Sequence, residues 1–211
     1  GSPELTRPQT AKSKRDEPQQ KRSAILDAAM EVFSEKGFHP ATIDEIAERA
    51  GVGKGTIYSY FDSKVALFQE LLEEILETTY QRTKERVANS EGTLSKLYAL
   101  ADVDHDVVKR YAPLARILLA DPSLVISPKF RRMLEHAQMQ LNALVANVIR
   151  QGQNEGIFSR EFHAELAASM VLGAKNGVIF DWLEVDSQRR PDPDQIRKQV
   201  VAFVERGLSA S

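Results

Sequence analysis

Residues 50–61 read AGVGKGTIYSYF, with three glycines, a lysine and a threonine followed by three aromatic residues within four positions. Glycine-rich stretches of this kind commonly hold phosphates, because glycine lets backbone N–H groups approach them closely. The phosphates could belong to a nucleotide or to a nucleic acid backbone. The residues around the stretch distinguish these two possibilities.

The known nucleotide-binding loops do not fit. A P-loop requires G-x-x-x-x-G-K-S/T, whereas here Gly55 follows Lys54 and Glu48 takes the place of the first glycine. A dinucleotide loop requires G-x-G-x-x-G after a strand, but Thr56 takes the place of the last glycine. The apolar residues before the loop recur at helical spacing, so no strand precedes it. The sequence therefore predicts neither an enzyme nor a nucleotide cofactor.

Composition narrows the remaining classes. The chain has 211 residues, of which 42% are hydrophobic and 27% charged, an ordinary balance for a globular protein with a sizeable core. It has no cysteine, which suits a reducing cytoplasm, and its four histidines are too scattered to indicate a metal site. With no run of about 18 apolar residues and no signal segment, we expect a cytoplasmic protein without a membrane partner.

Charge is unevenly distributed along the chain. The formal net charge is −2, so any surface that contacts DNA has to be local. Residues 1–20 are predicted to be a cloning scar (Gly1–Leu5) and a flexible basic arm, in a stretch from Arg7 to Arg22 where basic residues outnumber acidic ones. An arm that reads a DNA groove is the alternative.

Helical patterns surround the glycine-rich stretch. An apolar stripe in residues 25–33 predicts a first helix, and Thr42 with Glu45 forms a capping box that opens a short second one. Gly51 can end that helix in a left-handed conformation. A third short helix is predicted over Lys54–Phe61, and a longer fourth begins near Ser63.

Two short helices joined by a glycine turn and braced by longer helices indicate a helix-turn-helix domain, so the phosphates are those of DNA. Thr42 and the first amides of its helix can face a phosphate, since a helix N-terminus favours anions. Lys54 supplies positive charge. The small residues Gly55 and Thr56 allow the third helix to enter the major groove, where the threonine methyl can meet a thymine methyl.

The segment from about Lys21 to Leu72 resembles the DNA-binding domain of TetR/AcrR-family transcriptional regulators. The matching residues, 25–68, read ILDAAMEVFSEKGFHPATIDEIAERAGVGKGTIYSYFDSKVALF. The resemblance implies that the helix over 54–61 reads the major groove and that Lys64 contacts the DNA backbone. Asp62 stands where the family commonly has proline, and Val65 where it has glutamate; both affect the start of the fourth helix and not the reading of DNA.

The aromatic residues of the third helix have different expected roles. Tyr58 is expected to bury its ring and place its hydroxyl on a phosphate, with a pure core role as the alternative. Ser59 and Tyr60 are expected to project from the reading face, and Phe61 to lie in the core.

The rest of the chain is also predicted to be helical, over residues 93–104, 105–119, 127–154, 162–184 and 193–208. We divide the whole chain into the arm (1–20), the helix-turn-helix domain (21–68) and a ligand-binding and dimerisation domain (69–211). The fold class is therefore all-α, with a long helix joining the two domains. That helix, over about residues 63–85, could move the reading helix when a ligand binds.

The resemblance implies that the last two helices pair with those of a second copy. The candidates for a dimer interface are Gly173, Gly177, Phe180, Ile196, Val200 and Phe203. Ordinary packing within one chain is the alternative for each. A homodimer agrees with helix-turn-helix domains reading paired half-sites, so we expect a palindromic double-stranded DNA operator.

The helices between form the ligand chamber of the family, and adaptable methionines suit varied ligands. Candidate lining residues are Tyr98, Arg116, Phe130, Met133, Met139 and Met170; each could equally be plain core. We therefore expect a repressor that a small-molecule effector releases from its operator. The alternatives are an activator, a constitutive regulator or an acyl-CoA-responsive regulator of lipid metabolism.

Overall fold

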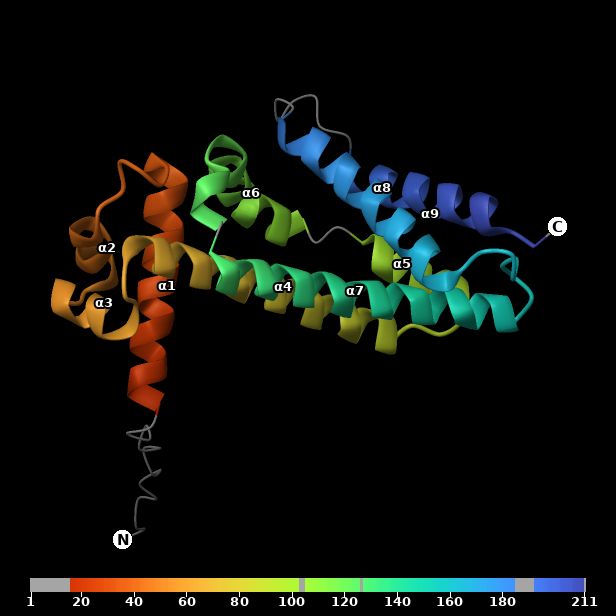
Figure 1. Ribbon diagram of the computed structural model, residues 1–211, viewed down its shortest axis with the longest axis horizontal. Helices are drawn as coiled ribbons and strands as arrows, with labels where there is room; N and C mark the ends of the chain where they lie inside the picture. Colours follow the sequence, from red (N-terminus) through yellow and green to blue (C-terminus); the bar gives the residue numbers. More distant parts are fainter. Residues whose placement is uncertain (1–15, 103–104, 126, 185–191, 211) are drawn as a thin grey trace, which may run out of the picture. The chain divides into compact units, whose positions relative to one another are not determined.

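A computed structural model describes residues 16–102, 105–125, 127–184 and 192–210 (Figure 1). Within these ranges the regular structure is helical, apart from an isolated antiparallel bridge between Phe158 and Ser209. The all-α prediction is confirmed. The chain forms two compact units, one ending at Leu71 and the other beginning at Leu72.

The first unit contains α1 (Asp16–Lys36), α2 (Ile43–Ala50), α3 (Lys54–Tyr60) and the start of α4 (Lys64–Ala88). Residues 1–15 lie outside the described residues. The flexible arm was expected to extend to residue 20, but α1 already begins at Asp16. An ion pair one turn apart, Lys21 with Glu17 at 3.1 Å, favours helix in this stretch.

Three phenylalanine rings hold the first unit together. Phe33 of α1, Phe38 of the following turn and Phe68 of α4 lie with ring centroids 5.3–5.6 Å apart. Two of these pairs meet edge to face, an arrangement that aromatic quadrupoles favour. Ile46 of α2 and Ile57 of α3 are fully buried, so both short helices are anchored to the unit's core.

The capping box of α2 is present as predicted. Thr42 Oγ1 accepts a hydrogen bond from the Glu45 amide at 3.2 Å, and Glu45 Oε2 accepts one from the Thr42 amide at 3.1 Å. Gly51 ends the helix with φ +67°, a left-handed conformation that other residues rarely adopt. The turn between α2 and α3 therefore follows from local sequence.

The second unit contains most of α4 and five further α-helices within the described ranges. These are α5 (Thr93–Ala101), α6 (His105–Ala120), α7 (Pro128–Asn154), α8 (Ala164–Glu184) and α9 (Pro193–Leu208), with a short 3-10 helix η1 (Pro122–Val125) after α6. They agree with the predicted ranges to within three residues at each end. Ser127 and Asp192 cap α7 and α9, each followed by proline in the first turn.

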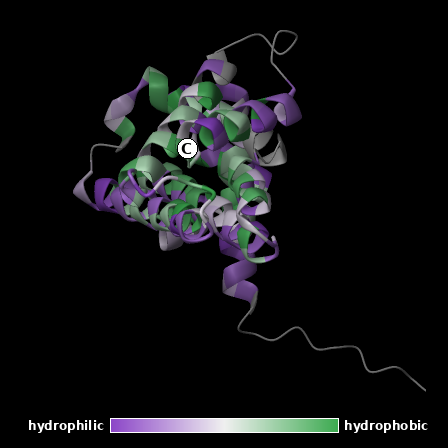
Figure 2. Ribbon diagram, turned by 90° about the vertical axis from the view of Figure 1, so that its right-hand side faces the viewer, coloured by the Kyte–Doolittle hydropathy of each residue, from purple (hydrophilic) through white to green (hydrophobic). Residues whose placement is uncertain are grey.

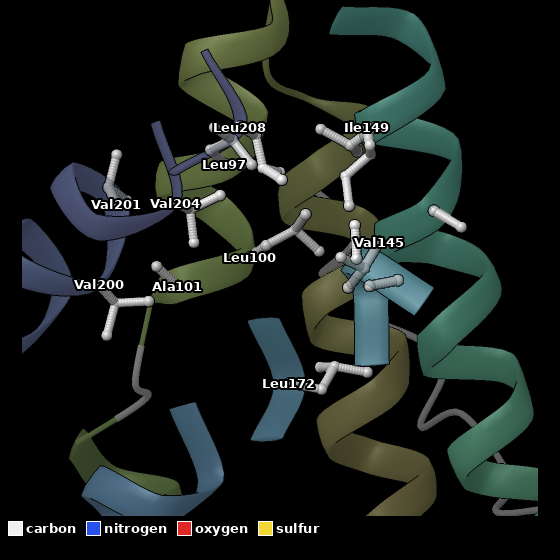
Figure 3. Packing of buried hydrophobic residues seen from close by; sticks show 14 of the residues in the cluster. Leu97, Leu100, Ala101, Val145, Ile149, Leu172, Val200, Val201, Val204 and Leu208 are labelled. Carbon is white, nitrogen blue, oxygen red and sulfur yellow. The ribbon is translucent and has the colours of Figure 1, made fainter. Parts of the chain in front are cut away.

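The core of the second unit is built by α5, α7, α8 and α9. Figure 3 shows Leu100 of α5, Val145 of α7 and Leu172 of α8 pointing toward a common centre. Gly152 allows a close approach there, because a Cβ at this position would lie 2.3 Å from the Phe158 ring. Figure 2 shows polar and apolar residues sharing the same helices, as in helices with one buried face.

A partly buried lysine links α8 to the end of α5. Lys175 Nζ donates hydrogen bonds to the carbonyls of Leu100 at 2.7 Å and Asp102 at 3.3 Å. Cations favour helix C-termini, where carbonyls lack helical partners. Burial lowers the pKa of Lys175 to about 8, and the nearby charge of Arg86 lowers it as well.

None of the helices within the described residues is long and apolar enough to cross a bilayer.

Candidate functional site

The turn between α2 and α3 presents one buried and one exposed face of α3. Ile57 and Phe61 are buried and fix the helix to its unit. Lys54, Gly55 and Ser59 are exposed. The sequence spacing alone predicts this division, since the buried pair lies one turn apart.

Gly55 has a feature that packing within the protein does not explain. A Cβ added at this residue would meet nothing within 4 Å. Alanine is the better residue inside a helix, by about 1 kcal/mol. The open space outside Gly55 therefore suits close approach of another molecule to the backbone of α3.

The two tyrosines differ from expectation. Tyr58, expected to bury its ring, is 47% exposed. Tyr60, expected on the reading face, is half-buried, with its ring centroid 6.3 Å from that of Phe61. The helical rotation of about 100° per residue gives the reason: around α3, Tyr60 lies about 60° from the buried Ile57, whereas Tyr58 lies about 100° from it.

The hydroxyl groups have partners within the chain. Thr42 is exposed, and its hydroxyl oxygen accepts the capping hydrogen bond while its own O–H can still donate outward. Ser59 donates to the carbonyl of Thr56 at 2.6 Å. Thr56 itself is half-buried.

Lys54 is paired with an acidic residue that sequence reasoning missed. Its Nζ lies 2.9 Å from Oδ2 of Asp44, in the first turn of α2. The hydrogen bond to Asp44 raises the pKa of Lys54. No local pattern pointed to this pair, because it depends on how the turn places the two helices.

Lys64 lies in a setting that differs from the expected phosphate contact. Its Nζ donates to the carbonyls of Phe38 at 2.9 Å, Ala41 at 2.8 Å and His39 at 3.3 Å. An ammonium has three N–H donors, so the three carbonyls use them all. It also lies 4.5 Å from the centroid of the Phe38 ring, and burial lowers its pKa. A phosphate would have to displace one of these carbonyls.

Two arginines that the sequence analysis did not single out hold the unit together. Arg22 of α1 pairs with Glu70 of α4, and its guanidinium lies 5.6 Å from the ring centroid of Phe61. Arg49 of α2 binds Glu35 of α1 through both terminal nitrogens, at 2.7 and 3.0 Å. These contacts orient α2 and α3 against their neighbours.

A pocket of about 840 Å³ lies in the second unit. Its lining comes from α4, α7 and α8: Leu76, Thr79, Tyr80, Leu134, Glu135, Ala137, Gln138, Met139, Leu141 and Asn176. Of the six candidate chamber residues, Met139 is in this lining. The other five are not: Tyr98, Arg116, Phe130, Met133 and Met170.

The reason lies in how the helices pack. Phe130 is buried, and Tyr98 packs against the core, with the Arg197 guanidinium 5.8 Å from its ring centroid. Met170 is exposed on α8. The residues that do line the pocket include Leu76 and Tyr80 of α4, which were not among the six chamber candidates.

The six candidates for the dimer interface divide in a similar way. Ile196 and Val200 are 4% and 7% exposed and belong to the core of their own chain, so they offer no surface to a partner. Phe203 is 71% exposed, and Gly173 and Gly177 are open to the outside. The side chain of Phe180 lies outside the described residues.

Comparisons with known proteins agree with this architecture. Residues 25–71 match the sequence model of the bacterial regulatory proteins of the tetR family. The chain is 27% identical over 165 residues to the transcriptional regulator UidR of Escherichia coli, covering 78% of this chain and 83% of UidR. It is 29% identical over 200 residues to the transcriptional repressor KstR2 of Rhodococcus jostii, covering 90% and 92%.

A further relative is the fatty acid metabolism regulator protein of Bacillus subtilis, 29% identical over 172 residues, with 78% and 84% covered. Among solved structures, the regulator FadR of B. subtilis in complex with stearoyl-CoA superposes with a TM-score of 0.71 at 22% identity, covering 88% of this chain and 98% of FadR. The matched domain, the fold and the relatives together identify the chain as a transcriptional regulator whose residues 25–71 form a DNA-binding domain of the tetR type.

Proposed function

We propose that this regulator is a homodimeric repressor that binds a palindromic operator through α3 and leaves it when a small molecule occupies the pocket of the second unit. The exposed outer face of α3 carries the proposal. It presents Lys54, Gly55, Tyr58 and Ser59 on a helix whose inner face is locked into the core. Its place of action would be the cytoplasm, where the operator lies.

The DNA-binding surface divides into two kinds of contact. Thr42 and Lys54 are positioned for phosphates, which fix the protein on the duplex without reading sequence. Thr56, Ser59 and the tyrosines are the candidates for base edges in the major groove. Lys64 acts through the turn that it holds, unless DNA displaces one of its carbonyls.

Dimerisation rests on the outer surface of α8 and α9. Leu166 and Met170 are exposed on α8, on the same stretch as the open Gly173, and Phe203 is exposed on α9. Exposed apolar residues on two helices that contact each other are typical of protein interfaces. A twofold dimer presents two reading helices, which requires half-sites about one helical turn of DNA apart.

The pocket is the proposed effector site. The surface of its described lining is largely apolar, with Glu135 as its charged residue and Thr79, Tyr80, Gln138 and Asn176 as hydrogen-bonding groups. Such a lining suits the apolar part of a ligand, with a few polar groups for orientation. An acyl-CoA effector is the more specific version, supported by the stearoyl-CoA complex of FadR and the fatty acid regulator of B. subtilis.

One continuous helix offers a route for coupling. α4 is 25 residues long, or about 37 Å at 1.5 Å per residue. Its first turns belong to the DNA-binding unit, and Leu76, Thr79 and Tyr80 further along line the pocket. A ligand that prefers a different tilt of α4 would change the spacing of the reading helices. It would weaken operator binding by no more than its differential affinity for the two states.

Selection of duplexes from a random pool by the full-length protein tests DNA binding. We expect enrichment of a palindrome bound by a dimer, with an affinity that falls steeply with salt. If no duplex is enriched over the starting pool, the DNA-binding role fails. Enrichment of a single half-site by a monomer would contradict the dimer instead.

A second experiment tests the effector. Small molecules that co-purify with the protein are identified by mass spectrometry and titrated into the operator complex, with stearoyl-CoA as a defined probe. We expect release of the operator, and reciprocal weakening of ligand binding by operator. If neither affinity depends on the other ligand, the protein is a constitutive regulator. A separate reporter assay distinguishes an activator, because expression of the reporter gene would then rise with the amount of the protein.

A further inference from the structure

The first unit, which carries the DNA-binding domain, has an excess of acidic residues although it has to meet the phosphates of DNA. Residues 16–71 contain ten Asp and Glu but only six Lys and Arg. The six are Lys21, Arg22, Lys36, Arg49, Lys54 and Lys64. Five of them form ion pairs with carboxylates of the same unit, and Lys64 donates to backbone carbonyls. In the free protein each of these cations already has a partner.

The pair on the DNA-facing side is Lys54 with Asp44. Lys54 is the first residue of α3, and Asp44 is the second residue of α2. Nζ and Oδ2 lie 2.9 Å apart, and both side chains are exposed. The carboxylate thus occupies one side of the ammonium that a phosphate would approach.

We propose that Asp44 lowers the affinity of this regulator for every DNA duplex by competing with phosphate for Lys54. The inference rests on the proposed function, in which Lys54 contacts the DNA backbone. Asp44 is therefore a residue that tunes non-specific binding and leaves the choice of operator to the base-contacting residues of α3.

The physical reason is the origin of non-specific affinity. A cation that neutralises a phosphate releases a condensed counterion from the duplex, which contributes to affinity at low salt. When Asp44 already balances Lys54, that gain is reduced, and the carboxylate also repels the approaching phosphate. Neither effect depends on base sequence, so operator and unrelated DNA are weakened alike.

The test measures dissociation constants of the full-length protein for the selected operator and for an unrelated duplex of equal length, over a series of salt concentrations. For Asp44→Asn we expect tighter binding of both duplexes by the same factor, up to about fivefold, the size of one exposed ion pair. The slope of affinity against salt should become steeper by up to about one. Asp44→Glu, which keeps the charge, should stay close to the parent.

Two matched variants separate the pair from general charge. Glu48→Gln removes one negative charge from the same helix without removing a partner of Lys54, so we expect a smaller gain. In a Lys54→Met background, Asp44→Asn should lose most of its effect. Equal gains for Asp44→Asn and Glu48→Gln, or a loss of affinity in correctly folded Asp44→Asn, would overturn the inference.

Failure of the premise is distinguishable. If Lys54→Met binds the operator with the salt slope of the parent, Lys54 is not a phosphate contact, and this inference falls while DNA binding stands. If the parent binds no duplex at any salt concentration, the proposed function and this inference fall together.

Discussion

At the level of single residues, the ammonium of Lys64 donates hydrogen bonds to three carbonyls of the turn between α1 and α2. This turn leads directly into Thr42 and the capping box of α2. Lys64 thereby connects the start of α4 to the segment that positions the helix-turn-helix. If the ammonium of Lys64 instead left these carbonyls and extended into solvent, it could bind a DNA phosphate directly.

Lys64→Met tests which role holds. It keeps the aliphatic stem and removes the donors, so we expect the free energy of unfolding to fall by about 1–3 kcal/mol, the effect of leaving carbonyls without their charged partner. Operator affinity should fall with an unchanged salt slope, as measured by denaturation and by binding at several salt concentrations. Lys54→Met is the control, with a shallower slope and unchanged stability. A Lys64→Met protein with parental stability and a slope shallower by roughly one would instead show a phosphate contact.

Gly55 supports a second prediction at this scale. Because a Cβ there meets nothing within the chain, Gly55→Ala should leave the protein as stable as the parent or more stable by up to about 1 kcal/mol. If the backbone of α3 approaches DNA closely at this point, the same methyl group should weaken operator binding by tenfold or more. Thermal unfolding and operator titration measure the two effects separately. Undiminished operator affinity in Gly55→Ala would remove this residue from the DNA interface.

At the level of elements, the helices are ended and joined by charged and polar groups placed at their termini. Thr42 caps α2, Ser127 and Asp192 cap α7 and α9, and Lys175 satisfies carbonyls at the end of α5. The first three are local signals, visible as a cap followed by proline or by glutamate three residues later. Lys175 reaches α5 from α8, more than 70 residues further along the chain.

Lys175 predicts a pH dependence of stability. Its pKa falls from the ordinary 10.5 to about 8 in the folded protein, so between these values the unfolded chain binds more protons than the folded one. The free energy of unfolding should therefore gain a contribution that rises with pH through this window, by at most about 1.4 kcal/mol per pH unit. Below pH 8 the burial of the charged ammonium opposes folding.

Denaturant unfolding of the parent and of Lys175→Met between pH 7 and 10.5 isolates this contribution, because other titrating groups are common to both proteins. We expect the stability of the parent relative to the variant to rise with pH. A constant difference across the range would show that the ammonium stays charged, or is solvated, in the folded state.

At the level of the whole molecule, the proposed dimer would form through the outer face of α8 and α9. Phe203 is a large apolar side chain left exposed beside a well-packed core, to which its neighbours Val201 and Val204 belong. In the proposed dimer a second copy would cover this side chain, as is typical of exposed apolar residues at interfaces. A dimer would bring two reading helices to one operator.

Phe203→Asp should therefore convert the dimer to a monomer, since an unpaired charge in an apolar interface costs several kcal/mol. Sedimentation equilibrium measures the assembly, and operator affinity should fall with it because one half-site is lost. Phe203→Leu should remain dimeric. A Phe203→Asp protein that sediments as a dimer with parental operator affinity would place the interface elsewhere.

Most of the first unit could be predicted from the sequence because its signals are local. The capping box of Thr42, the left-handed Gly51 and the helical spacing of Ile46 and Ile57 each act within a few residues. The helix boundaries of the second unit follow from caps and prolines in the same way. The candidate site residues were harder, because exposure on α3 depends on its rotation against the core, and Tyr58 and Tyr60 lie differently from expectation.

Only the tertiary structure decided which residues meet across long distances in the chain. Sequence alone determined an all-α regulator with a helix-turn-helix, since periodicity, caps and turns are properties of neighbouring residues. The carbonyl partners of Lys64, the pairing of Lys54 with Asp44, the burial of Ile196 and Val200, and the lining of the pocket depend on how separate helices pack. Apolar residues are interchangeable in a pattern, but packing assigns each one to the core, to a pocket or to an exposed face.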